Sequence, residues 1–412
     1  MPADTRAPAE PVELDAVDLT DPRTHAETDL EPYWRRLRDE RPVFRHRATA
    51  GTPGFWVVTR HADIVAVYRD DKRFASTGGN VLSTLLHGGD SASGRMVPVT
   101  DGPRHLVMRR SMSQAFAPRA LRSVAEHVRA ATRRLLATAV AGGGCDFVAD
   151  VAAHIPLVTI CELLGVPEAD RERLLRLTSS ALASPGPAQS ASATWLVRNE
   201  LLLYFADLVR ARRAAGRSDE AGDVVSLLLR DGLLTEDEVV LNCYSMMIGG
   251  DETTRLAMSG AVAALAHHPE QWRRLKDGTV TVATAVEEML RWTTPAGHAG
   301  RRASTDVVLH GVDIRAGDVV TVWNVSGNRD EREFARPARL DLGRTPNRHL
   351  SFGYGRHFCL GAQLARIELA ALLDELRGQV RSIELTRHPR RLYSTFLNGY
   401  AELAVAMEPE RR

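Results

Sequence analysis

The chain has 412 residues, of which 44% are hydrophobic and 25% are charged, and its formal net charge is +1. These are ordinary values for a soluble globular protein with a large core. A net charge so close to zero gives no overall electrostatic attraction to nucleic acid or to an anionic membrane surface, so neither is an expected partner.

Targeting and cysteine patterns are equally plain. No apolar run approaches the ~20 residues that span a bilayer, and the acidic, proline-containing start lacks the apolar stretch of a signal peptide. The four cysteines form no C-x-x-C pair, so disulfides and a zinc site are not expected. The expected compartment is therefore the reducing cytoplasm, with no membrane segment.

The first hundred residues predict a tail, a short strand and a long loop. Residues 1–25 are expected to be loosely ordered. "FWVVTR" (55–60) predicts a strand, and "HADIVAVYRD" after it predicts a helix. Residues 77–100 are rich in glycine and serine and predict a long loop with room for one short helix. Loops of this length in a compact domain are often functional.

From Pro103 to about residue 295 the apolar period is helical almost throughout, and the longest expected helix runs over 235–268. "DVVLHGVDIRAGDVVTVW" then predicts three short strands, and Asn398-Gly399 predicts the turn of a terminal hairpin. No stretch within 26–412 reads as a linker. The sequence thus predicts a single mainly helical domain with a minor β portion.

Cys359 stands in "SFGYGRHFCLGAQLAR" (351–366), just before a helical pattern. The free N–H groups and positive dipole end of a helix N-terminus stabilise a thiolate. Glycines around it leave out side chains where the backbone must bend or pass close to a bulky group. A thiolate under a flat metal macrocycle suits this pattern, but so does a small buried cysteine beside a turn. A dinucleotide loop does not, because the G-x-G-x-x-G spacing fails and no strand precedes it.

The long helix carries a second candidate site in "GGDETT" (249–254). Two glycines inside a helix each cost ~1 kcal/mol relative to alanine. Gly250, Thr253 and Thr254 lie at i, i+3 and i+4 and so share one face. This pattern favours a local opening of the helix with room for a small ligand and water, or else a close helix crossing.

The stretch around Cys359 resembles the haem-binding signature of the cytochrome P-450 family, F-G-x-G-x-H-x-C-x-G. The matching residues are Phe352, Gly353, Gly355, His357, Cys359 and Gly361. The resemblance implies the single-domain cytochrome P-450 fold, haem b as cofactor and Cys359 as the thiolate ligand of its iron. "GGDETT" is similar to the family's oxygen-binding segment, which places Glu252 and Thr253 on its acid–alcohol pair and Gly250 beside the cofactor. Thr254, on the same face, is a second candidate for the alcohol.

Further resemblances run from about residue 30 to residue 408. Glu288 and Arg291 in "AVEEMLRW" match the family's E-x-x-R pair, which locks to a later loop behind the haem. The resemblance also implies cationic partners for the haem propionates. These are His105, Arg109, Arg301 and His357, with Arg302 leaving the third assignment ambiguous by one place.

The implied activity is that of a haem-thiolate monooxygenase that oxidises a small organic substrate, with natural-product biosynthesis as the expected setting. Electrons would come from a separate ferredoxin or flavodoxin and its NAD(P)H-dependent reductase. The expected pocket regions are the 77–100 loop, a lid near 180–200, and the substrate-contact residues Met246, Met247, Ala296, His298, Thr395 and Phe396. A peroxide-driven peroxygenase and a non-catalytic haem or ligand-binding protein are the alternatives. Neither needs the acid–alcohol pair.

Overall fold

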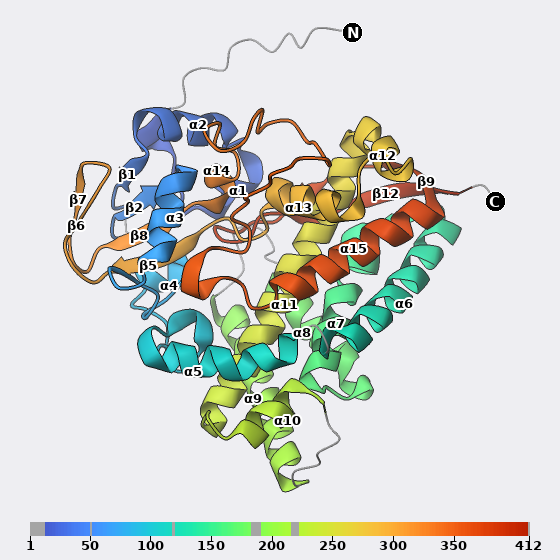
Figure 1. Cartoon of the computed structure of the whole chain (residues 1–412), viewed down its shortest axis with the longest axis horizontal. Coiled ribbons are helices and arrows are strands. Elements are labelled where there is room, and N and C mark those ends of the chain that lie inside the picture. Colours follow the sequence, from blue (N-terminus) through green and yellow to red (C-terminus); the bar gives the residue numbers. More distant parts are fainter. Residues whose placement is uncertain (1–12, 50–51, 118–119, 183–190, 216–221, 411–412) are drawn as a thin grey trace, which may run out of the picture.

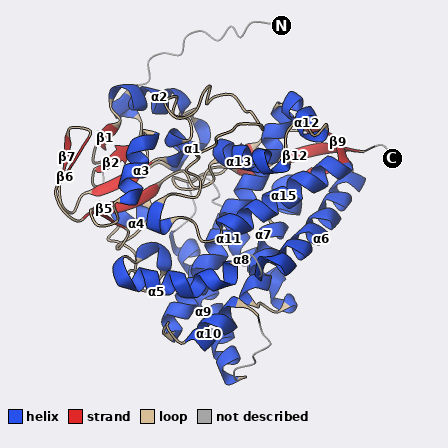
Figure 2. Ribbon diagram, in the orientation of Figure 1, coloured by secondary structure: helices blue, strands red, loops and turns tan. Residues whose placement is uncertain are grey.

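The computed structural model describes residues 13–49, 52–117, 120–182, 191–215 and 222–410. Helices fill the centre and one end of the molecule, and small sheets lie at two of its edges (Figures 1 and 2). The fold is therefore mainly helical with a minor β portion, as predicted. Part of the predicted lid, residues 183–190, lies outside the described residues.

The α-helices have the following bounds: α1 Pro22–Glu27, α2 Glu31–Glu40, α3 His61–Arg69, α4 Leu82–Leu86, α5 Gly102–Ser113, α6 Ala120–Ala141, α7 His154–Leu164, α8 Glu168–Leu182, α9 Ala191–Ala214, α10 Val224–Asp231, α11 Glu236–His267, α12 Pro269–Lys276, α13 Val282–Thr293, α14 Asn324–Gly327 and α15 Ala362–Gln379. Short 3-10 or π turns are η1 Leu14–Ala16, η2 Val97–Val99, η3 Gln114–Phe116, η4 Val148–Ala152 and η5 Gly355–His357.

The strands are β1 Val43–His46, β2 Phe55–Val58, β3 Phe74–Ala75, β4 Gly144–Asp146, β5 Ala299–Ala303, β6 Val307–Leu309, β7 Val312–Ile314, β8 Val319–Val322, β9 Val380–Leu385, β10 Arg390–Arg391, β11 Tyr400–Glu402 and β12 Ala404–Pro409. The largest sheet has the order β1-β2-β8-β5-β3, in which β2 and β8 are parallel and the other neighbours antiparallel. The smaller sheets are β4-β12-β9, β6-β7 and β10-β11.

Helix α11 is the axis of the fold and crosses the molecule diagonally, with α15 beside it (Figure 1). Its start is fixed by a capping box in which Thr235 and Glu238 satisfy each other's backbone N–H groups. Every residue from Thr254 to Leu265 is buried. A helix that is buried all round belongs inside a bundle, and here α7, α9, α13 and α15 contact it.

The segment before α2 is packed, although the sequence assigns residues 1–25 to a loose tail. Residues 1–12 lie outside the described residues. Leu14 and Leu19 are buried in one apolar cluster with Trp34 and Trp323. His25 stacks on Trp323 with ring centroids 5.7 Å apart. The apolar residues after position 13 therefore join the core, which the high acid and proline content of the segment concealed.

The terminal hairpin forms between β10 and β11, but not around a tight turn at Asn398-Gly399. Strands β10 and β11 pair antiparallel, and the Leu392 N–H donates to the carbonyl oxygen of Gly399 at 3.0 Å, so the connection is longer than two residues. Leu397, inside this connection, forms an isolated bridge with Ala296. The Asn398 N–H donates to the carbonyl oxygen of Pro295 at 2.8 Å. Strand β12 pairs with β4 and β9. The bridge to Ala296 thus draws out the connection between β10 and β11 and brings it against the segment that leads into β5.

Candidate functional site

One interior cavity of about 310 Å³ gathers most of the predicted site residues. Its walls come from the 77–100 loop, α5, α11, the segment leading into β5, and the loop that leads into α15. The predicted residues that line it are Arg109, Met246, Gly250, Thr253, Thr254, Ala296, His298, Arg301, Phe352, His357, Cys359, Gly361 and Phe396.

Four of the residues predicted for catalysis, cofactor binding or substrate contact do not line this cavity. They are His105, Met247, Glu252 and Thr395. Met247 is fully buried in the main apolar cluster, because the residue after Met246 points to another side of α11. It is a core residue and not a substrate contact. Adjacent residues of a helix point in different directions, so they cannot all line the same cavity. The sequence analysis assigned Met246 and Met247 to the pocket together and did not separate them.

The loop before α15 holds Cys359 in a fixed shape. The Cys359 N–H donates to the carbonyl oxygen of Phe352 at 2.9 Å. Gly355 has a φ of 70°, and a Cβ there would lie 2.6 Å from the carbonyl oxygen of Tyr68. Glycine is therefore required for the loop to pass α3 so closely.

The Cys359 side chain is accessible because it faces the cavity and not the outer surface. Burial raises the pKa of the thiol, while the Gly361 N–H and the Arg109 guanidinium oppose this by favouring the thiolate. The other cysteines, Cys145, Cys161 and Cys243, do not line the cavity. Cys359 is thus the thiol placed to bind a group inside it.

Cationic side chains lie near the cysteine. Arg109 donates to the carbonyl oxygen of Phe358 at 2.6 Å, and Arg301 is buried over the ring of Tyr68 at 5.3 Å. The ambiguity between Arg301 and Arg302 is resolved by strand alternation in β5. Arg301 lines the cavity, whereas Arg302 turns away and donates to the carbonyl oxygen of Gly317 at 2.7 Å.

His105 and His357 form a pair at this edge, with ring centroids 4.4 Å apart. His357 Nε2 bonds to Asp101 Oδ1 at 2.9 Å. His105 Nε2 is buried and has no hydrogen-bond partner in the structure. Burial, followed by the charges of His357 and Arg109, lowers the pKa of His105 to about 4. Buried polar atoms nearly always have a hydrogen-bond partner, so His105 Nε2 indicates that a bound group supplies the missing one.

These residues fit a haem group. A thiol faces the cavity, cations and an unsatisfied histidine nitrogen lie beside it, and a Cβ at Gly249 would meet nothing within 4 Å. A flat macrocycle with two carboxylates needs such a set: a soft ligand, cationic partners and a wall free of side chains. Cys359 would ligate the iron, and Arg109, Arg301, His105 and His357 would hold the propionates.

Helix α11 carries the predicted acid–alcohol pair, Glu252 and Thr253. The local opening of the helix that the sequence predicts at Gly249 and Gly250 is not formed. The helix is unbroken from Glu236 to His267. The Thr253 hydroxyl donates to the carbonyl oxygen of Gly249 at 2.8 Å, which leaves its oxygen lone pairs to accept a hydrogen bond. Gly249 and Gly250 line the cavity and place no side chain in it. Burial, and then the neighbouring charge of Asp251, raises the pKa of Glu252 to about 8.

Glu368 is a cavity residue that the sequence analysis missed. It lies in α15, is 2% exposed, and contacts Thr159 and Thr254. Burial, aided by the charge of Asp251, raises its pKa to about 8 against the effect of these hydroxyls. The signal available in the sequence was its place nine residues after Cys359, in a helix with otherwise apolar neighbours. Sequence alone does not show that this face meets α11.

Glu368→Gln tests this protonation. The pKa of Glu368 rises from 4.5 to about 8 on folding, so between these values the native state keeps a proton that the unfolded state has lost. The contribution of Glu368 to the free energy of unfolding should therefore fall as pH rises from 5 to 8. Because glutamine cannot ionise, the variant should gain on the wild type by up to ~1.4 kcal/mol per pH unit. Urea unfolding at pH 5, 6.5 and 8 measures this, and parallel curves would show that Glu368 is charged.

The E-x-x-R pair lies away from the cavity as a structural lock. Glu288 and Arg291 are both fully buried and form two hydrogen bonds of 2.8 Å. Arg344 donates to Glu288 at 3.0 Å, and Arg291 donates to the carbonyl oxygens of Asn328 and Pro337. A buried charge pair with every donor and acceptor satisfied fixes the chain segments it joins. It ties α13 to the loops that precede Cys359.

His298 lines the cavity, but its Nε2 atom already has a hydrogen-bond partner in the 77–100 loop. Its Nε2 accepts the N–H of Leu82 at 3.1 Å, which fixes the 77–100 loop to the start of β5. Burial lowers the pKa of His298 to about 3, so the ring is neutral, and its Nδ1 is enclosed. Its ring packs at a tilt against Trp323 and meets the ring of Phe396 edge-on. A substrate would meet its carbon edge and not a free nitrogen.

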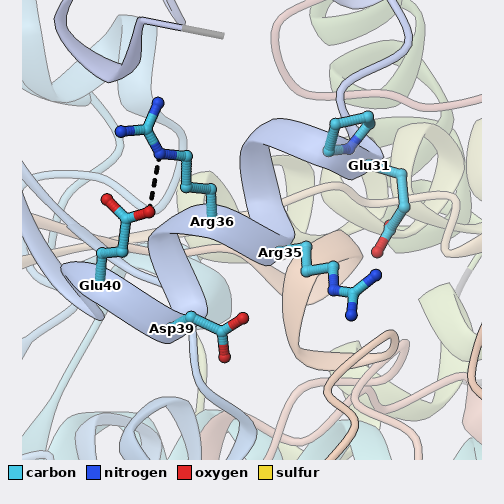
Figure 3. Close-up of a pocket in the computed structure, with 6 residues that line it drawn as sticks. Glu31, Arg35, Arg36, Asp39 and Glu40 are labelled. Atoms are coloured by element: carbon cyan, nitrogen blue, oxygen red, sulfur yellow. Dashed lines mark hydrogen bonds and ion pairs between the residues drawn. The ribbon is translucent and has the colours of Figure 1, made fainter. Parts of the chain in front are cut away.

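A second hollow of about 370 Å³ lies on the outer side of α2 (Figure 3). Its residues are Glu31, Pro32, Arg35, Arg36, Asp39 and Glu40. Arg36 and Glu40 bond to each other at 2.8 Å, and Arg35 is 69% exposed. Exposed charges that pair along one helix contribute little and form a solvated face. The interior cavity, and not this hollow, is therefore the candidate functional site.

Comparison with known proteins gives one consistent family. Residues 281–376 match the family model described as Cytochrome P450. The chain is 45% identical to "Cytochrome P450 NovI" of Streptomyces niveus, over 97% of this chain and 98% of that one. It is 34% identical to a "Methyl-branched lipid omega-hydroxylase" of Mycobacterium bovis, over 90% and 89%. The crystal structure of P450 OxyD, "involved in the Biosynthesis of Vancomycin-type Antibiotics", superposes with a TM-score of 0.88 at 37% identity, over 96% of this chain and all of that one.

Proposed function

This chain belongs to the cytochrome P450 family, and from that premise we propose that it is a haem b monooxygenase that oxidises a small organic molecule in the interior cavity. The observation that carries the proposal is that the thiol of Cys359 and the hydroxyl of Thr253 line the same cavity. When bound, thiolate-ligated haem supplies the oxygen chemistry: with two electrons and two protons, one atom of O₂ enters the substrate and the other leaves as water.

The residues of this chain have separate tasks in that reaction. The thiolate of Cys359 would be the iron ligand. His105, His357, Arg109 and Arg301 would orient the cofactor by binding its propionates. Thr253 offers a fixed oxygen acceptor at the cavity wall, where it can hold a water molecule. Glu252, whose pKa is raised to about 8, can both hold and release a proton near neutral pH. We assign it the role of bringing protons to Thr253 from outside the cavity.

The direct test is reconstitution. Haem-loaded protein is titrated with candidate molecules while the Soret band is followed, and turnover is then measured with ferredoxin, ferredoxin reductase and NADPH. Product formed only with the electron-transfer proteins supports a monooxygenase. Product formed with hydrogen peroxide alone would favour the peroxygenase, and binding without turnover would favour a non-catalytic haem protein. OxyD, named for antibiotic biosynthesis, supports natural-product intermediates as the first molecules to try.

We propose the cytoplasm as its place of action, where NAD(P)H is available and thiols stay reduced. Among the described residues no helix is both long and apolar enough to cross a bilayer. Electrons would arrive through an acidic ferredoxin or a flavodoxin on the face that carries Cys359. One exposed apolar side chain supports a docking surface there: Leu106 on α5 is 49% exposed.

Charge reversal tests the docking surface. Arg110 is exposed on α5 and makes no ion pair with another described residue, whereas Arg356 is already paired with Asp71 at 3.1 Å. Arg110→Glu should therefore slow reduction by ferredoxin roughly 3- to 10-fold at low ionic strength, and Arg356→Glu less. Both effects should fade in high salt because exposed charges are screened. Stopped-flow reduction measures this, with Arg315→Glu on the β7–β8 turn as control; equal rates for Arg110→Glu and this control would remove α5 from the docking surface.

A further inference from the structure

Two polar side chains of the cavity wall are left without a partner, Asn80 in the 77–100 loop and Ser245 in α11. We propose that Asn80 and Ser245 bind a neutral hydrogen-bonding group of the substrate, such as a hydroxyl, a phenol or a carboxamide, and so determine which molecules are accepted. This inference rests on the proposed function, because it takes the cavity to hold haem and substrate together.

Most other polar side chains of the wall already have partners. The pairs are Tyr68 with Asn324, Thr253 with Gly249, His298 with Leu82, Ser351 with Leu290, and His357 with Asp101. Thr254 and Glu368 are in contact with each other. The Asn80 carboxamide and the Ser245 hydroxyl make no hydrogen bond to any described residue. Both residues are partly exposed and line the cavity, so their polar atoms are open to a ligand or water there.

The backbone of Asn80 is held rigidly at the wall. Its carbonyl oxygen accepts the N–H of Gly300 at 2.7 Å, which fastens the loop to β5. A Cβ at Gly300 would lie 2.3 Å from Leu85 Cδ1, so a larger residue there would displace the Leu85 side chain of this loop. Because the backbone is fixed, the carboxamide is presented at a defined place and loses little freedom when a ligand binds.

Ser245 is equally fixed by its helix. It precedes Gly249 by four residues and Thr253 by eight, so all three lie along one face of α11. The neighbouring Asn242 clamps the far end of the 77–100 loop, accepting the Val97 N–H at 2.9 Å and donating to the Arg95 carbonyl oxygen at 3.1 Å. The loop is thus fastened to both β5 and α11, and the two free polar groups face one cavity from these two supports.

The chemistry of the pair indicates a neutral group. Neither a carboxamide nor a hydroxyl carries charge, and burying a charged group without a counter-ion costs far more than burying a neutral one. The cations of the wall, Arg109, Arg301 and His357, lie at the edge assigned to the propionates. Glu368, with its pKa at about 8, is largely neutral at pH 7 and contacts Thr254. A ligand bound at Asn80 and Ser245 therefore finds polar partners but no free opposite charge.

The test uses two matched series of probes on the haem-loaded protein. One series is 1-alkylimidazoles with two to eight carbons, and the other is their ω-hydroxy counterparts. The imidazole ligates the iron and shifts the Soret band, which gives Kd, while the chain explores the cavity. At the length that reaches the pair, replacing the terminal methyl by hydroxyl should improve binding to the wild type by about tenfold more than to Asn80→Leu/Ser245→Ala, the effect of one neutral hydrogen bond.

Each result decides the matter. Ser83→Ala, at an exposed position of α4, should keep the wild-type ratio. Unchanged Kd values for the alkyl series show that the double variant is folded. If at no chain length the hydroxyl-to-methyl ratio differs between wild type and double variant, the inference is wrong. If ω-ammonium probes show the same dependence on Asn80 and Ser245, the preference for a neutral group is wrong. If the wild type binds no haem, the proposed function fails first and this inference fails with it.

Discussion

Cys359→Ser is expected to abolish the long-wavelength absorption band that a thiolate-ligated haem gives when it is reduced and bound to carbon monoxide. Only Cys359 among the cysteines lines the cavity, and the Phe352 carbonyl holds its backbone in place. A serine hydroxyl is a poorer ligand and does not donate electron density as a thiolate does. Monooxygenase turnover should fall by more than ~100-fold, because even outer partners of a metal ligand are worth 10–100-fold.

The control for this experiment is Cys145→Ser. Cys145 is partly buried in β4, and burial raises the pKa of its thiol to about 12, so it remains protonated. This variant should keep both the band and the turnover. A Cys359→Ser protein that still showed the band would mean that Cys145, Cys161 or Cys243 is the ligand and that the cavity has been assigned to the wrong group.

The cysteine loop and the propionate edge could be placed from the sequence because their residues stand in one local motif or on one helix face. Cys359, His357 and Arg109 line one cavity. Arg301 and Arg302 could not be separated, since the choice depends on which side of β5 faces the cavity. That depends on the pairing of β5 with β8, a contact between distant parts of the chain.

The same physical reason explains what was missed. Glu368, Asn80 and Ser245 belong to no motif; each matters only because a loop or helix elsewhere places it at the wall. The hairpin of β10 and β11 has a longer connection than the Asn398-Gly399 signal predicts, because Leu397 pairs with Ala296. Local propensity decides where an element begins, but contacts between distant elements decide which of its side chains are left free to act.

Thr253→Ala is expected to uncouple electron consumption from oxidation. The Thr253 hydroxyl is bonded to Gly249, so its removal takes away an acceptor at the wall without breaking the backbone of α11. Haem and substrate should still bind, and NADPH should be consumed at a rate within ~3-fold of the wild type. Product per NADPH should fall about tenfold or more, with hydrogen peroxide appearing in its place, because protons are no longer delivered to the right atom.

Glu252→Gln should act differently, and the contrast separates the two roles. A carboxyl group with a pKa of about 8 can take up and release a proton near neutral pH, whereas an amide cannot. We expect the whole cycle to slow by roughly 100-fold with coupling largely kept. Oxygen-electrode, peroxide and product measurements on the same samples distinguish slowing from uncoupling.

Thr254→Ala is the matched control, since Thr254 is the adjacent hydroxyl at the same wall but contacts Glu368. If Thr254→Ala uncouples while Thr253→Ala does not, the delivering hydroxyl is one residue further along and its proton comes from Glu368. Should neither variant release peroxide, both hydroxyls are packing groups, and the proton must reach the cavity through solvent or the substrate itself. The hydroxyl that sets the coupling therefore also identifies which of the two carboxyl groups, Glu252 or Glu368, supplies the proton for the reaction.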